Sequence, residues 1–332
     1  MADLRYHVVS LAAVLLAMAV GVTLGAGPLR DPVGAVASSG VLEQRLERAE
    51  AEREGARADV AALDTASARL AEHTATDGVG VLHEEAVALL VLPGTPASQV
   101  ARVARALQDA GAAEVPSVRL TRGWVAADGT ADRAALAARV QPLLVDPDDT
   151  RPGGDTTLLA EGLADVLTAA AAAPAGTGTD ARVVAGLLAT SGLLEGDEAL
   201  EPAAAVAVVV VAPGPPPRGS RATGAAADDP GAWVDVVRGL AGRLPVVAVE
   251  DAAPVAASGR AARPGVVAAV RAQLGAAASG AGWAARTSTV DHLATDSGSW
   301  ATVLAVAASA DGGQGDYGLL DTAADGPLPH PG

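Results

Sequence analysis

An uncharged stretch near the amino terminus places the strongest constraint on how this chain can fold. No charged residue occurs from Tyr6 to Leu29, and Arg5 and Arg30 bound the run. As an α-helix these residues would extend roughly 36 Å, which is more than the roughly 30 Å of a bilayer's hydrocarbon core. No polar face interrupts the run, so a helix buried in a soluble core is the poorer reading. We therefore expect a transmembrane anchor over residues 1–30.

The alternative is a cleaved signal peptide, with the cut just after Gly25 and Gly27. Two features favour an uncleaved anchor. The apolar run is longer than the roughly 7–15 residues of a usual signal sequence, and the segment before it offers only Arg5 against Asp3. The positive-inside rule slightly prefers a cytoplasmic amino terminus. We expect a single-pass protein of the cell membrane or outer envelope, with its body exported.

Small residues recur along one face of this predicted helix, at Ala13, Ala17, Gly21 and Gly25. Such a face lets two helices approach closely in lipid. Gly21 and Gly25 are therefore candidates for a structural pairing motif. The alternative is that the spacing reflects only the abundance of alanine and glycine in this chain.

A second helical pattern follows over residues 38–75. Apolar positions recur at alternating steps of four and three residues, which is the period of a coiled coil. The seam consists of Leu42, Leu46, Ala49, Arg53, Ala56, Val60, Leu63, Ser67 and Leu70. Arg53 and Ser67 weaken it. We expect a coiled-coil stalk and a possible homodimer; a single solvated helix, or one docked on the body, is the alternative.

Composition excludes several classes of protein. The chain has no Cys, and all 23 of its basic residues are Arg. Disulfides, thiolate metal sites and Cys nucleophiles are excluded, as are the P-loop lysine and Schiff-base chemistry. A net charge of −16 argues against a nucleic-acid partner.

From residue 79 to 320 the pattern changes to alternating strands and helices. Short, continuously apolar runs are typical of strands covered on both faces of a parallel sheet. The predicted strands are 86–92, 115–120, 205–212, 245–249 and 286–290, and the predicted helices are 98–110, 132–140, 156–173, 233–244, 264–274 and 300–309. Asp155 or Thr156 is the expected cap of the third helix, and residues 176–179 read as a flexible link. The fold class is α/β: a transmembrane helix, a short coiled coil, then an α/β sandwich with a mainly parallel sheet. Residues 321–332 form a tail.

No constellation of residues indicates catalysis or metal binding. His83-Glu84-Glu85 lacks the second histidine of a zinc-protease helix, because Val87 stands in its place. The sequence from Gly313 to Gly318 fits G-x-G-x-x-G, but a helix precedes it where a dinucleotide site needs a strand. We predict no enzyme, cofactor or resident metal. A hydrolase- or transferase-like enzyme is a lesser alternative, which would show a polar pocket at the carboxyl ends of the strands.

Two segments resemble a known family. One runs from Leu4 to Val14 and continues through Gly21, Val22, Thr23, Leu24 and Gly25; the other comprises Thr289, Val290, Asp291, Gly298, Leu304, Ala305, Gly312, Gly315, Tyr317 and Gly318. Both resemble the actinobacterial copper transport protein family called MctB, which opens with a similar basic lead and apolar helix and closes with a similar glycine-rich motif. The layout of anchor, coiled coil and α/β body is also similar.

The resemblance implies a role in copper efflux or transport, or in forming a channel in the outer envelope. Copper is implied by the family alone, and no binding residues are carried over. The alternative is an envelope scaffold or binding protein without metal transport. For the closing motif we predict that Asp291 ends a strand, and that Gly298, Gly315 and Gly318 let the chain fold Tyr317 back onto the body. The alternative is a frayed tail from Asp311.

Overall fold

A computed structural model describes residues 45–51, 54, 80–144, 154–169, 178–196, 200, 203–214, 229–251, 265–277, 282–293, 295–318, 323 and 325. The chain divides into two compact units, Met1–Ala56 and Arg57–Gly332. The described strands all belong to the second unit.

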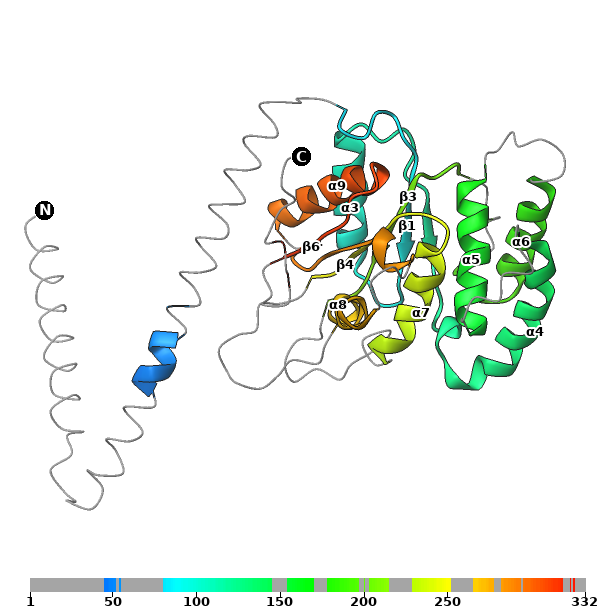
Figure 1. Cartoon of the computed structure of the whole chain (residues 1–332), viewed down its shortest axis with the longest axis horizontal. Helices are drawn as coiled ribbons and strands as arrows, with labels where there is room; N and C mark the ends of the chain where they lie inside the picture. The colour runs from blue at the N-terminus through cyan, green and yellow to red at the C-terminus, as the bar shows by residue number, and fades with distance from the viewer. Residues whose placement is uncertain are drawn as a thin grey trace, which may run out of the picture. The chain divides into compact units, whose positions relative to one another are not determined.

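A parallel sheet of six strands forms the centre of the second unit (Figure 1). Its strands are β1 (Val87–Val91), β2 (Ser117–Arg119), β3 (Ala207–Val211), β4 (Val246–Val249), β5 (Thr287–Val290) and β6 (Asp316–Tyr317). They lie in the order β2-β1-β3-β4-β5-β6. The central strands are fully buried. Runs of valine, alanine and leucine form them because both faces of the sheet are covered.

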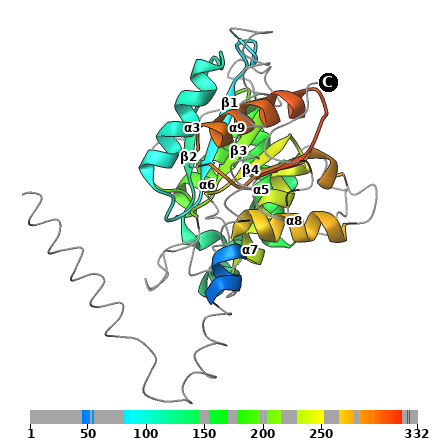
Figure 2. The same cartoon turned by 90° about the vertical axis from the view of Figure 1, so that its left-hand side faces the viewer.

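Helices cover the two faces of the sheet (Figure 2). The side chains of the central strands β1 and β3 alternate between the two cores that these helices form with the sheet. On one face α3 (Ala97–Asp109) and α9 (Asp296–Ala310) pack over Val87, Leu89 and Val91. On the other, α7 (Pro230–Ala241) and α8 (Val266–Ala276) belong to the core that holds Ala88 and Leu90. The mainly parallel α/β sheet predicted from the sequence is confirmed.

Three further helices extend the second core away from the sheet (Figure 1). They are α4 (Thr130–Val140), α5 (Asp155–Thr168) and α6 (Gly178–Thr190). Helix α5 packs against α4, α6 and α7. Short 3-10 turns, η1 (Arg122–Trp124), η2 (Ala127–Gly129), η3 (Gln141–Leu143) and η5 (Ala284–Arg286), complete the described elements. The buried Trp124 donates its indole N–H to the carbonyl of Leu193 at 2.9 Å, which ties η1 to the segment after α6.

Three local predictions were wrong. Helix α5 ends at Thr168 rather than near residue 173, and its N-cap is Gly154, without a side-chain cap. Residues 178 and 179, predicted as part of a flexible link, begin α6. Helix α6 buries Val184, Ala185 and Leu188, and this packing outweighs the poor helix propensity of its two glycines. Strand β6 was not predicted as a strand.

The predicted membrane anchor, from Tyr6 to Leu29, lies outside the described residues. Within the part of the chain that the structure describes, no helix is long and apolar enough to span a bilayer.

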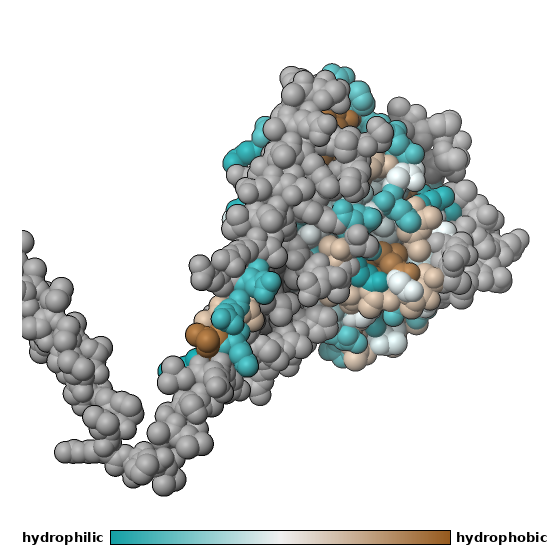
Figure 3. Space-filling model, turned by 60° about the vertical axis from the view of Figure 1, so that its left-hand side comes forward, coloured by the Kyte–Doolittle hydropathy of each residue, from teal (hydrophilic) through white to brown (hydrophobic). Residues whose placement is uncertain are grey.

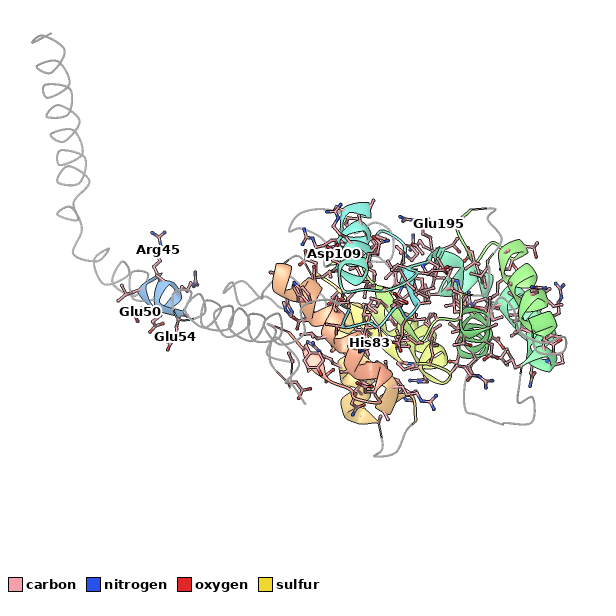
Figure 4. All side chains as sticks on the ribbon, turned by 90° about the horizontal axis from the view of Figure 1, so that it is seen from above. Arg45, Glu50, Glu54, His83, Asp109 and Glu195 are labelled. Atoms are coloured by element: carbon pink, nitrogen blue, oxygen red, sulfur yellow. The ribbon has the colours of Figure 1, made fainter. Side chains whose placement is uncertain are left out.

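Only part of the predicted stalk is described: residues 45–51 and 54 are helical and exposed. Arg45, Glu50 and Glu54 project outward from this helix (Figure 4). Its surface is mostly hydrophilic, with a hydrophobic exception (Figure 3), and Leu46 is 61% exposed. An exposed leucine at a seam position agrees with the heptad pattern, but the coiled coil and the homodimer stay predictions.

Candidate functional site

Charged and polar side chains gather where β4, β5 and β6 end. We call Glu250, Arg271, Thr289, Asp291 and Asp316 the carboxyl-edge cluster. Glu250 directly follows β4, and Asp291 directly follows β5. Parallel strands bring such residues to the same edge of the sheet. Glu250 and Asp291 are 1% and 0% exposed, and Arg271 on α8 is 6% exposed, so the charges lie inside the protein.

Arg271 is the hub of this cluster. One terminal nitrogen, Nη1, donates to Asp291 Oδ2 at 2.6 Å, and the other, Nη2, donates to the backbone carbonyl of Tyr317 at 2.9 Å. The remaining nitrogen, Nε, donates to Thr289 Oγ1 at 2.8 Å. Thr289 in turn donates to Asp316 Oδ1 at 2.8 Å. A single guanidinium thus joins α8 to β5 and β6 through charge-assisted hydrogen bonds.

The side chain of Glu250 lies at the amino-terminal end of α8. Its Oε2 accepts a hydrogen bond from the backbone N–H of Val267 at 3.0 Å. Burial raises the pKa of the Glu250 carboxyl to about 7, and the negative charge of Asp291 adds to the rise. The hydrogen bond from Val267 and the positive charge of Arg271 act in the opposite direction. Burial dominates because it removes water from the charged form.

His292 lies next to Asp291 and is 3% exposed. Its Nδ1 is 3.6 Å from Asp291 Oδ1, beyond hydrogen-bond distance. Neither ring nitrogen has a hydrogen-bond partner among the described residues. The described residues also contain no group of three or more His, Cys, Asp or Glu side chains that could hold a metal ion.

The glycine-rich closing motif lies against this cluster. Tyr317 lies in β6, which pairs with β5, and its side chain is 6% exposed. A Cβ at Gly315 would overlap the Tyr317 ring, and one at Gly318 would overlap the Asp291 carboxylate. A Cβ at Gly298, on α9, would likewise overlap the backbone carbonyl of His292. These glycines let the backbone approach groups that any larger residue would displace.

The structure brings together five of the seven residues singled out in the sequence. Asp291 follows a strand, and Tyr317 is folded back, in place of the frayed tail that was the alternative. Gly21 and Gly25 lie outside the described residues. The segment from Gly313 to Gly318 follows α9 and contains β6, so its surroundings differ from those of a dinucleotide loop.

Sequence reasoning missed Glu250 and Arg271, and each left a signal. Arg271 is the one charged residue of α8, which is apolar elsewhere except at Gln273, and Glu250 directly follows a fully apolar strand. Both charges are buried in the fold, and a buried charge requires partners. Chemically, the hydrogen bonds of the cluster tie α8, β5 and β6 to one another.

The match to a known protein family covers nearly the whole chain. Residues 1–328 match the family described as copper transport outer membrane protein, MctB. The chain belongs to the MctB family. No curated protein matches the chain. The MctB match confirms the resemblance seen in the sequence, and it puts the chain among envelope proteins related to copper transport.

Proposed function

We propose that this chain is a membrane-anchored envelope protein that helps to move copper out of the cell. The observation that carries the proposal is the MctB match, which spans residues 1–328 and so includes both the amino-terminal segment and the α/β body. The uncharged run from Tyr6 to Leu29 supports a single-pass anchor with the body exported. The acidic composition and the absence of Cys are compatible with an exported location but do not require it.

The body acts by binding and support rather than by catalysis. The polar groups of the carboxyl-edge cluster bond mainly to one another: Arg271 to Asp291, Thr289 to Asp316, and Glu250 to the backbone of α8. Catalytic groups need an open face toward a substrate. This internal pairing favours a structural task for the cluster.

A channel would require several copies, because one transmembrane helix cannot enclose a pore. The helix at residues 45–51 exposes Leu46 at a seam position, which supports pairing between two copies. Cross-linking of single-cysteine variants at Leu42 and Leu46 in native membranes tests this step. Dimer bands at both positions, and none at Ala51, which lies opposite the seam, are the expected pattern. Equal cross-linking at all three positions would contradict a specific seam.

A growth experiment tests the copper role. A strain without the gene should grow less well than the wild type in raised copper, and the full chain should restore growth. A chain without residues 1–30 should fail to restore it, provided that immunoblotting shows equal amounts of protein. The same comparison in raised zinc is the control and should show no difference between strains.

A second candidate function is an envelope scaffold without metal transport. The observation in its favour is that the described residues hold no cluster of metal-ligating side chains. In that case the deletion strain grows like the wild type in copper, and affinity purification of the full chain recovers a protein partner.

A further inference from the structure

A pocket of about 640 Å³ lies on the helical side of the second unit, away from the carboxyl-edge cluster. It is bounded by α5, α7, α8 and the turn that precedes β5, and the labelled helices are seen in Figures 1 and 2. Gly242 precedes β4, and Trp283 and Arg286 precede β5. The pocket is therefore beside the amino ends of these strands. Its volume falls within the roughly 300–1,000 Å³ of typical small-molecule sites.

The apolar wall of the pocket is an indole surrounded by small residues. Trp283 is half-buried, and the guanidinium carbon of Arg238 lies 5.4 Å from the centre of its ring. Ala276, Ala277 and Gly282 line the space beside it. The indole and the planar guanidinium over it suit a flat, unsaturated ligand, because contact between flat groups buries much area at little entropic cost.

Among the described charged residues that line the pocket, Arg286 has no carboxylate partner. Arg238 pairs with Asp235 at 2.9 Å, and Glu161 pairs with Arg243 at 3.6 Å. Arg286 donates a hydrogen bond to the carbonyl of Gly242, and no carboxylate of a described residue pairs with it. Arg286 is exposed, so its charge lies at the mouth of the pocket. This arrangement selects an anionic group on the ligand.

Two neutral polar residues, Thr157 and Gln273, line the pocket. Thr157 is 5% exposed, and its Oγ1 is closed off from solvent, so a ligand does not reach that hydroxyl. Gln273 is exposed, and its amide can donate a hydrogen bond to a ligand or accept one.

We propose that this pocket binds a small planar organic anion, an aromatic carboxylate with a hydroxyl group. The ring stacks in the space beside Trp283, the carboxylate pairs with Arg286, and the hydroxyl bonds to the amide of Gln273. The site is distinct from the proposed role in copper movement and does not depend on it.

Calorimetric titration of the full chain in detergent, with 6-hydroxy-2-naphthoate as probe, tests the site. We expect saturable binding of one molecule per chain. The neutral 2-naphthol, which keeps the ring and hydroxyl but lacks the carboxylate, should bind at least about tenfold more weakly. Equal affinity for the two probes would overturn the assignment of an anion.

Three variants locate the binding, and the first two have matched controls. Arg286→Gln should weaken binding about tenfold, while Arg105→Gln, at an exposed arginine on α3, should leave it unchanged. Gly282→Leu should fill the pocket and abolish binding, because a Cβ there meets no atom within 4 Å. Gly275→Leu, which is equally free of contacts but does not line the pocket, is its control. Gln273→Met should lower the affinity several-fold, with no change in how the pocket discriminates by charge.

Melting temperatures of the variants separate lost binding from lost folding. Lost binding in Gly282→Leu at an unchanged melting temperature supports the site. An absence of saturable binding by the wild type would overturn the proposal. So would affinity that is the same in the wild type, Arg286→Gln and Gly282→Leu, because the probe would then be binding elsewhere or to detergent.

Discussion

At the scale of single residues, the carboxyl-edge cluster concentrates most of the buried charge in the described body. Glu250, Asp291 and Arg271 lie within it at 6% exposure or less. Buried charges stabilise a fold only when each has its partners, and removing one partner leaves another unsatisfied. Substitutions here are therefore expected to have larger effects than those on the solvated faces.

The stability of the protein should fall as pH rises, through Glu250. The ordinary pKa of 4.5 applies in the unfolded chain, whereas the folded chain raises the pKa of Glu250 to about 7. Between these values the folded chain keeps a proton that the unfolded chain releases. The stability from this group is therefore complete below about pH 4.5 and is lost as pH rises through about 7. The loss amounts to about 3 kcal/mol.

Denaturant unfolding of the wild type and Glu250→Gln at pH 5 and pH 8 measures this effect. Gln keeps the shape of the protonated acid but does not titrate. The free energy of unfolding of the variant, relative to that of the wild type, should therefore rise by up to about 3 kcal/mol from pH 5 to pH 8. A stability difference that is the same at pH 5 and pH 8 would show that Glu250 does not titrate in this range.

Tyr317 should contribute to stability through packing. Its ring is buried over Gly315, and Tyr317→Ala should cost about 2–4 kcal/mol because the lost ring leaves a cavity. Thermal unfolding with circular dichroism is the measurement. Melting temperatures that coincide would mean that the ring contributes nothing to the fold.

Strand β6 is bonded to a residue of the predicted tail, 321–332. Asp325 accepts a hydrogen bond from the N–H of Asp316 at 2.8 Å and donates its own N–H to the Asp316 carbonyl at 3.0 Å. A truncation at residue 321 would therefore remove two hydrogen bonds from β6.

At the scale of elements, the sequence predicts the strands better than the helix ends. Val87–Val91 and Ala207–Val211 are continuous apolar runs, and only a strand covered on both faces needs that composition. Helix α6 begins with glycine and threonine, and its stability comes from packing of Leu188 and its neighbours, which a local pattern does not contain. Strand β6 has two residues, too few for any period to show.

The carboxyl-edge cluster was only partly predictable, for a related reason. Thr289 and Asp291 belong to a recognisable motif, whereas Arg271 bonds to Asp291 and to the Tyr317 carbonyl, which are 20 and 46 residues distant in sequence. The sequence shows a charge in a mostly apolar helix, which indicates that it has partners, but a local pattern does not show which distant residues they are.

The packing of α5 on α7 depends on a glycine. A Cβ at Gly239 would overlap the backbone carbonyl of Thr157 and lie 2.7 Å from the Ala160 Cβ. Gly239→Ala should therefore cost about 1–3 kcal/mol, because the two helices have to move apart. Gly186→Ala, in α6, meets no atom within 4 Å and should gain up to about 1 kcal/mol. Chemical denaturation of both variants tests the pair; equal effects would show that the interface is not tight.

At the scale of the whole molecule, the uncharged run between Arg5 and Arg30 predicts attachment to the membrane. The full chain should sediment with membranes, resist alkaline carbonate and keep its native amino terminus. Deletion of residues 1–30 should release it into the soluble fraction. Amino-terminal sequencing that begins near Pro28 would establish cleavage of a signal peptide instead.

The central claim is that this MctB family member moves copper out of the cell, and copper retained by cells tests it most directly. Cells of the wild type, the deletion strain and the complemented strain are loaded with copper, washed, and assayed for cell-associated copper by mass spectrometry over time. The account predicts slower loss from the deletion strain, with normal loss restored by the full chain and not by the chain lacking residues 1–30. Identical loss from all the strains would contradict it.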